Sequence, residues 1–165
     1  MGKANSIVIG IILVSVVIFG GIIFAALKNK PIQTTQYNIN EKEKPQIQIS
    51  ETDFSFGKIK VSDIVTKEIQ IKNTGFKDLE LQNFSTSCDC TFAQLKIGEQ
   101  KSPKFTMHQN SPWQGLVPPN QTATLSVIYE PARMPVKGQV NRAVFFESND
   151  PQKPEITIKF TAEME

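Results

Sequence analysis

The sequence predicts an all-β domain, an antiparallel β-sandwich, preceded by one transmembrane helix near the N-terminus. Three observations lead to this architecture: an apolar run, a polar stretch after it, and then alternation of apolar and polar residues with a period of two. The expected organisation is a short stub at residues 1–6, a transmembrane anchor at 7–27, a flexible linker at 28–44 and the β-sandwich domain at 45–165.

The apolar run at residues 7–27 contains no charged residue. About 20 apolar residues in a helix cross a hydrocarbon core of roughly 30 Å. A cleaved secretion signal is the alternative, but its apolar core usually has about 7–15 residues and ends in a small-x-small site. Here the pairs that end at Ala25 and Ala26 begin with the bulky Ile23 and Phe24. The run therefore favours an uncleaved anchor.

The charges that flank the anchor do not orient it. Lys3 lies before the run, and Lys28 and Lys30 lie after it, so the count of positive residues is close to a tie. The simplest topology is a short cytoplasmic stub followed by export of everything after Leu27. We therefore expect a single-pass protein of the cell membrane with an extracytoplasmic C-terminal domain.

The overall charge excludes some functions. The chain has 18 basic and 16 acidic residues, which is close to neutral and gives no basic face for nucleic acid. No polybasic strip argues for binding to lipid headgroups. Residues 28–44 are polar with few apolar positions, so they cannot bury enough surface to order themselves and are predicted to be a spacer.

The alternating segments predict the strands of the sandwich. They lie at residues 46–50, 67–72, 79–82, 123–129, 140–147 and 156–160. Clusters of Pro, Gly, Asn and Asp separate them, and Asn73-Thr74-Gly75 can close a hairpin. Short strands at this spacing predict an antiparallel sandwich in which one face of each strand is buried.

Several local motifs occur in a recognisable order along the domain. They are Phe54-Ser55-Phe56-Gly57-Lys58-Ile59, Ile71-Lys72-Asn73-Thr74-Gly75, Thr86-Ser87-Cys88-Asp89-Cys90-Thr91, Pro118-Pro119-Asn120-Gln121, Val127-Ile128-Tyr129-Glu130-Pro131 and Ser148-Asn149-Asp150-Pro151. Over residues 46–162 the chain resembles a bacterial domain family of unknown function marked by a Cys-Gly-Cys-Thr signature. That family is similar in turn to the ASH/Hydin-type immunoglobulin-like domains.

The resemblance implies a secreted or membrane-tethered immunoglobulin-like module without catalytic residues. Two positions depart from the family pattern. Asp89 replaces the middle Gly of the signature, and Asn120 stands in a turn where the family has Gly. Asn tolerates a left-handed backbone, so the turn at Asn120 stays plausible.

One group of residues has the atom types for chemistry: Cys88, Cys90, Met107 and His108, which include both cysteines and the only histidine. In an extended segment both thiols of Cys88 and Cys90 would project from one face, with Cα atoms roughly 6.5–7 Å apart. Two thiolates with a thioether or imidazole suit a soft cation, Cu(I) first and Zn(II) next. The sequence leaves three interpretations open: a structural pair, reduced or disulfide-linked, a soft-metal site, and a redox-active thiol pair.

Trp113 is the other candidate, because it lies in a loop between two turn signals. It either caps the open end of the core or serves as an exposed binding anchor. No arrangement of serine, histidine and acid points to hydrolysis, so we expect no enzyme. The sequence favours a binding or scaffolding module at the cell envelope, with a protein or glycan partner. The alternatives are a copper-binding domain and a partner in thiol-disulfide exchange.

Overall fold

The computed structural model of the chain describes residues 12, 15–16, 18–21, 34–108 and 112–165. Contacts divide the chain into two units between Gln33 and Thr34. The described residues of the first unit are helical, and no helix among the described residues has the length and apolar character to cross a membrane. Most of the anchor expected at residues 7–27 lies outside the described residues, so it stays a prediction.

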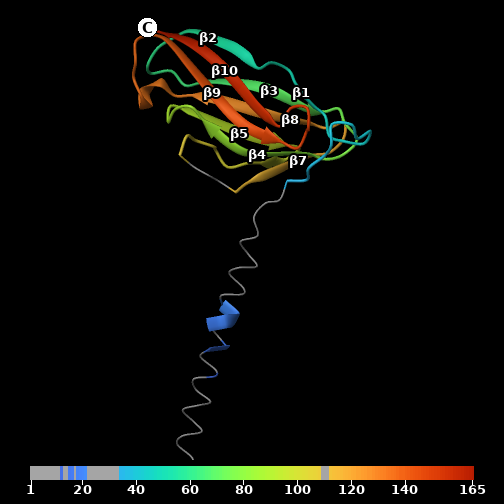
Figure 1. Cartoon of the computed structure of the whole chain (residues 1–165). Coiled ribbons are helices and arrows are strands. Elements are labelled where there is room, and N and C mark those ends of the chain that lie inside the picture. Colours follow the sequence, from blue (N-terminus) through green and yellow to red (C-terminus); the bar gives the residue numbers. More distant parts are fainter. Residues whose placement is uncertain (1–11, 13–14, 17, 22–33, 109–111) are drawn as a thin grey trace, which may run out of the picture. The chain divides into compact units, whose positions relative to one another are not determined.

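The second unit is a β-sandwich (Figure 1). In the described residues, one five-stranded sheet has the order β1-β3-β8-β5-β6 and the other has the order β2-β10-β9-β4-β7. The bounds are Ile47–Ile49 for β1, Asp53–Ile59 for β2, Val65–Asn73 for β3, Leu79–Thr86 for β4, Thr91–Ile97 for β5, Gln100–Lys101 for β6, Gln114–Val117 for β7, Thr122–Tyr129 for β8, Gly138–Ser148 for β9 and Glu155–Met164 for β10. A short 3-10 helix, η1, covers Pro131–Arg133.

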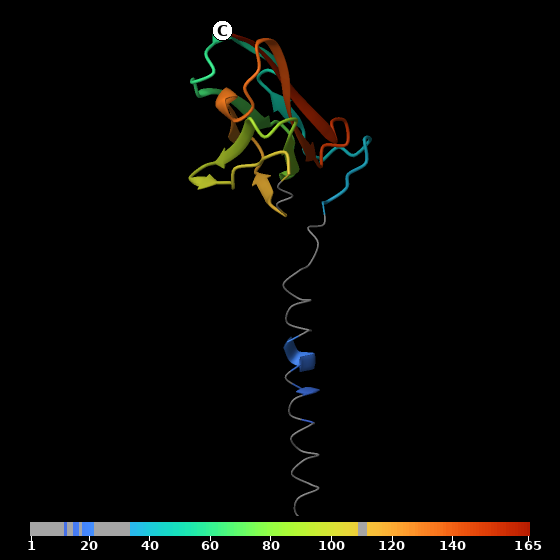
Figure 2. The same cartoon turned by 90° about the vertical axis from the view of Figure 1, so that its left-hand side faces the viewer.

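The two sheets face each other (Figure 2), and the buried side chains of the core follow the predicted alternation. In β3, Ile69 and Ile71 are fully buried while the residues between and beside them are exposed. Leu125 and Val127 of β8 are buried in the same way. Burial of such a side chain contributes about 1.5–3 kcal/mol, so the alternating residues supply most of the driving force.

The aromatic strand β2 packs against β10 through its two phenylalanines. Phe54 and Phe56 lie on one side of the strand, and their ring centroids are 5.5 Å and 5.1 Å from that of Phe160 in β10. Gly57 has a φ of 71°, a conformation that glycine adopts without strain. It lies next to the register shift between β2 and β10, so the irregular pairing comes directly after the two phenylalanines.

Two details of the pairing differ from the prediction. Strand β2 pairs with β10 in parallel, not antiparallel, because alternation shows which face is buried but carries no information about strand direction. The turn at Asn73-Thr74-Gly75 closes no hairpin. The strand before it, β3, pairs with β1 and β8, whereas β4 pairs with β7 and β9 in the other sheet. The chain crosses between sheets here.

Asn73 explains this crossing. It is fully buried, and its side-chain amide donates hydrogen bonds to the carbonyl oxygens of Lys77 and Val117, each at 2.8 Å. Its side-chain oxygen accepts the N–H of Gly75 at 2.9 Å. The side chain therefore satisfies backbone groups that would otherwise continue a sheet. Only glycine fits at position 75, because a Cβ there would collide with the Lys44 carbonyl oxygen.

Buried polar residues also follow β9. Asp150 accepts the N–H of Ile47 at 2.9 Å and that of Gln152 at 2.9 Å. Asn149 accepts the N–H of Glu80 at 2.9 Å. The turn that ends β9 therefore fastens β1 and β4 to the sandwich.

Part of the stretch predicted as a spacer contacts the domain. The N–H of Thr35 donates to the Glu80 carboxylate at 2.9 Å, and Glu43 pairs with Lys77 at 2.9 Å. Lys44 is buried. These polar contacts order residues 34–44 although the segment has few apolar side chains. The remainder of the predicted linker, residues 28–33, lies outside the described residues.

Candidate functional site

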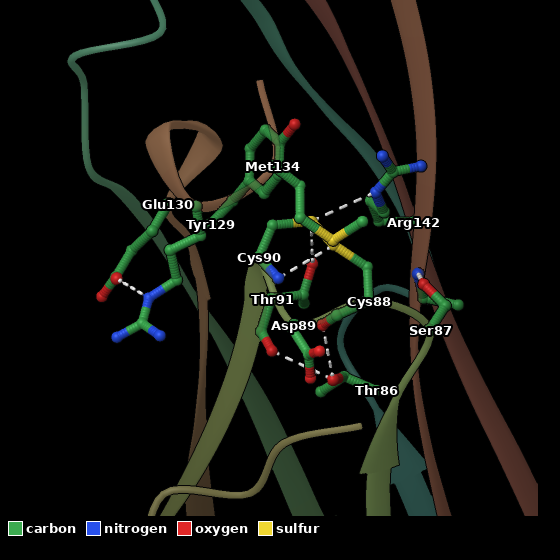
Figure 3. The surroundings of a disulfide bond; sticks show 12 residues. Thr86, Ser87, Cys88, Asp89, Cys90, Thr91, Tyr129, Glu130, Met134 and Arg142 are labelled. Carbon is green, nitrogen blue, oxygen red and sulfur yellow. Dashed lines mark hydrogen bonds and ion pairs between the residues drawn. A yellow bond between two sulfur atoms is a disulfide. The ribbon is translucent and has the colours of Figure 1, made fainter. Parts of the chain in front are cut away.

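The two cysteines lie in the turn that joins β4 to β5, and a disulfide links them (Figure 3). Their Cα atoms are 5.2 Å apart, closer than the distance expected for an extended segment. The turn accounts for the difference, because the N–H of Thr91 donates to the Cys88 carbonyl at 3.1 Å and folds the segment back. The two sulfur atoms are therefore brought together by a turn and not by an extended strand.

Four groups contact the sulfur atoms directly, and one of them, the Thr91 hydroxyl, lies 3.9 Å from Cys90 Sγ. The backbone N–H of Cys90 donates to Cys88 Sγ at 2.9 Å, and Arg142 Nε donates to Cys90 Sγ at 3.4 Å. Met134 Sδ lies 3.9 Å from Cys88 Sγ. Figure 3 shows Arg142 and Met134 beside the two sulfurs, with the Asp89 carboxylate directed away from them. Both cysteines are buried, Cys90 completely.

The predicted ligands Met107 and His108 lie on the surface. Met107 is 45% exposed, and the His108 side chain is 74% exposed and 3.4 Å from the Asp89 carboxylate. His108 thus reaches the cysteine turn through Asp89 and not through a sulfur. In the part of the chain that the structure describes, no three His, Cys, Asp or Glu side chains converge as a metal-binding group. The proposed copper set of Cys88, Cys90, Met107 and His108 stays a prediction.

Two residues of the cysteine site were missed in the sequence. Met134 lies far along the chain in the segment after η1, and no local pattern links it to Cys88. Arg142 does carry a signal. It has the inward-facing register between the buried Val140 and Val144 of β9, so a charged residue points toward the core there.

Trp113 packs against the aromatic cluster at the beginning of β7. Its ring centroid lies 6.0 Å from that of Phe84 and 5.5 Å from that of Phe105, and the residue is half-buried. Gly115 leaves room for the indole, because a Cβ there would collide with it. This is the arrangement expected of a residue that caps the core.

The sheet that contains β2, β10, β9, β4 and β7, which we call the second sheet, carries a groove of about 410 Å³ on its outer face. Strands β2, β9 and β10 and the turn residue Ser87 line it. Ala143 and the 39% exposed Phe145 give it an apolar floor, and Thr157 and Lys159 are among its polar lining residues. The groove is therefore an exposed apolar surface with polar groups around it, next to the cysteine turn.

These features match a known class of domain. A family model described as the HYDIN/CFA65/VesB-like immunoglobulin-like domain matches residues 45–163. The chain belongs to this family. The resemblance to Hydin-type immunoglobulin-like domains expected from the sequence is thereby confirmed, and the family match covers both the cysteine turn and the groove.

The chain is also similar to solved structures. A protein of unknown function from Porphyromonas gingivalis W83 is similar with a TM-score of 0.56 and 20% identity, over 82% of this chain and 51% of that one. The chain thus spans about half the length of that protein. The ASH/PapD-like domain 7 of human CEP192 matches with a TM-score of 0.45 and 14% identity, over 83% of this chain and 93% of that domain. No curated protein matches the chain.

Proposed function

We propose that this protein is a membrane-tethered binding module, not an enzyme, whose immunoglobulin-like domain faces the extracytoplasmic side. The apolar run at residues 7–27 supports the tether. The groove on the outer face of the second sheet is the observation that carries the binding role. Phe145 exposes 39% of its surface there, beside Ala143, and an apolar floor with polar groups around it is typical of a site that desolvates a partner.

The partner expected is an envelope protein or a glycan. An exposed aromatic ring serves both, because it buries apolar area against a protein side chain or stacks on the face of a sugar. Ser87, Thr157 and Lys159 would supply hydrogen bonds around that contact. Most of the groove lies on a sheet face built from three strands, so its shape depends little on the turn that carries Ser87.

Photocrosslinking in cells of the source organism tests the binding role. The full-length chain carries a photoreactive amino acid at position 145 or, as the matched control, at position 116. Leu116 is also exposed, at 50%, and lies in β7 of the same sheet. We expect a discrete adduct from position 145 that disappears when Lys159→Glu is added. Protease or glycosidase treatment of the adduct identifies the class of partner.

Equal adducts from both positions, or none from position 145, would contradict the groove as the binding site. The tether is tested separately on the full-length chain with a C-terminal tag. We expect the tag in the membrane fraction and its removal by protease added to spheroplasts. A tag that is recovered in the soluble fraction, or that is protected in spheroplasts, would overturn the proposed location.

A further inference from the structure

The backbone of the cysteine turn is held by hydrogen bonds that do not involve sulfur. The Thr86 hydroxyl lies 3.0 Å from the carbonyl oxygens of both Cys88 and Thr91. The N–H of Glu130 donates to the Cys90 carbonyl at 2.8 Å. The N–H of Ser87 donates to the Ala143 carbonyl at 3.0 Å. Opening the disulfide would therefore leave both ends of the turn in place.

The surroundings of the sulfurs stabilise the product of such an opening. A thiolate is stabilised by hydrogen-bond donors and positive charge. Arg142 offers both to Cys90 through its Nε–H at 3.4 Å, and the Cys90 N–H serves Cys88 at 2.9 Å. Asp89, the carboxylate between the two cysteines, is 3.4 Å from His108 and points away from the sulfurs (Figure 3).

The two sulfurs differ in how a reagent can reach them. Cys90 is completely buried, and Arg142 Nε lies against its sulfur. Cys88 is covered by Met134, which is itself 46% exposed. Met134 belongs to an exposed segment, residues 132–137, which consists of the last two residues of η1 and the irregular residues after it. Such a segment opens at low cost in free energy, so Cys88 is the accessible sulfur.

We propose that Cys88–Cys90 is an exchangeable disulfide that accepts two electrons from a dithiol reductant. One thiolate of the dithiol attacks Cys88 Sγ, so a mixed disulfide forms and the Cys88–Cys90 bond breaks. Cys90 leaves as a thiolate next to Arg142. The second thiol of the reductant loses its proton and attacks its own mixed-disulfide sulfur, which releases Cys88. The two thiol protons end on Cys88 and Cys90 or in solvent, and the reductant becomes a disulfide.

This inference does not depend on the proposed binding function. Arg142 acts as a positioning and charge-stabilising residue, because the rate of exchange rises as the pKa of the leaving thiol falls. Met134 acts as a cover over the attacked sulfur. Reduced and oxidised forms would share one fold and differ at the surface formed by residues 132–137, where Met134 covers Cys88.

The test uses the purified full-length chain in mild detergent with dithiothreitol as the dithiol. Free thiols are alkylated at intervals and counted by mass spectrometry, while circular dichroism follows the β signal. We expect reduction under native conditions without loss of that signal. In Arg142→Gln the rate should fall about threefold or more, with a partial recovery in Arg142→Lys. The matched control is Arg133→Gln, since Arg133 is the other arginine and pairs with Glu130 rather than with a sulfur.

Two further measurements separate exchange from a structural role. Limited glutathione followed by peptide mapping should give an adduct on Cys88 and a free thiol on Cys90. In the reduced protein, the pH profile of Cys90 alkylation should move to higher pH in Arg142→Gln. Met134→Ala should speed reduction about threefold or more, relative to Val136→Ala. A disulfide that opens only in denaturant, an adduct on Cys90, or equal rates in the two arginine variants would overturn the proposal.

Discussion

The two ends of the sandwich fix their turns by different means. At the end of β3, the buried amide of Asn73 holds two carbonyl oxygens at 2.8 Å, and Asp150 accepts two N–H groups at 2.9 Å. At the opposite end, a covalent bond joins Cys88 to Cys90 beneath an exposed segment. We call these the polar end and the sulfur end.

The difference shows which bond the fold requires. At the polar end, loss of a side chain leaves buried backbone groups without partners, and each such group costs about 1–3 kcal/mol. At the sulfur end, the backbone groups have partners that persist without the disulfide. We therefore expect the fold to require the hydrogen bonds of the polar end, although each is weaker than a covalent bond. The disulfide at the sulfur end can be opened without loss of the fold.

Asn73→Ala should have the largest effect on stability. It removes both amide donors and the acceptor of the Gly75 N–H in a fully buried site. We expect the free energy of unfolding to fall by about 3 kcal/mol, measured by urea denaturation. Asn141→Ala, at an exposed position of β9, is the control and should change it by less than about 0.5 kcal/mol. Similar losses in both variants would remove the distinction between the ends.

Replacement of both cysteines by Ala should have a smaller effect. A disulfide between residues two positions apart closes a very short loop. Its restriction of the unfolded chain therefore raises the free energy of the unfolded state by only about 1.5 kcal/mol. We expect a loss of that order in the same urea experiment, with the β signal retained. If the double variant lost as much as Asn73→Ala, the disulfide would be a structural fastening.

Tyr129→Phe should have the smallest effect on stability, and this effect appears only at high pH. Tyr129 is fully buried near the sulfur end. Burial raises the pKa of its phenol above the ordinary 10.0, and the charge of Arg142 partly offsets this. The unfolded protein therefore loses the phenol proton first. The contribution of the buried neutral phenol to the free energy of unfolding is complete below pH 10.0, and it is lost as the pH rises through the pKa of Tyr129 in the folded protein.

The measurement is the urea midpoint from pH 8 to pH 11 for the wild type, Tyr129→Phe and the control Tyr37→Phe. The decline with pH should be shallower in Tyr129→Phe than in the other two proteins. A decline of equal slope in all three would show that Tyr129 makes no contribution to it.

The sequence predicted the features that depend on neighbouring residues. Alternation located the buried faces of β3, β8 and β10, and the expected left-handed turn at Asn120 is confirmed by its φ of 62°. Features that depend on distant segments were missed. The crossing after Asn73 depends on Val117, and the thioether beside Cys88 comes from Met134 rather than from Met107. Local spacing does not show which loops meet at one end of a sandwich.

The parallel pairing of β2 with β10 has a consequence for synthesis of the domain. Phe54 is paired with Phe160, and Ile59 with Met164, so one of the first strands to leave the ribosome finds its neighbour among the last. Until then a row of backbone donors and acceptors stays open along β2, beside two large aromatic rings. Contacts so far apart in sequence form slowly, so we expect this edge of the sheet to be the last part of the domain to close.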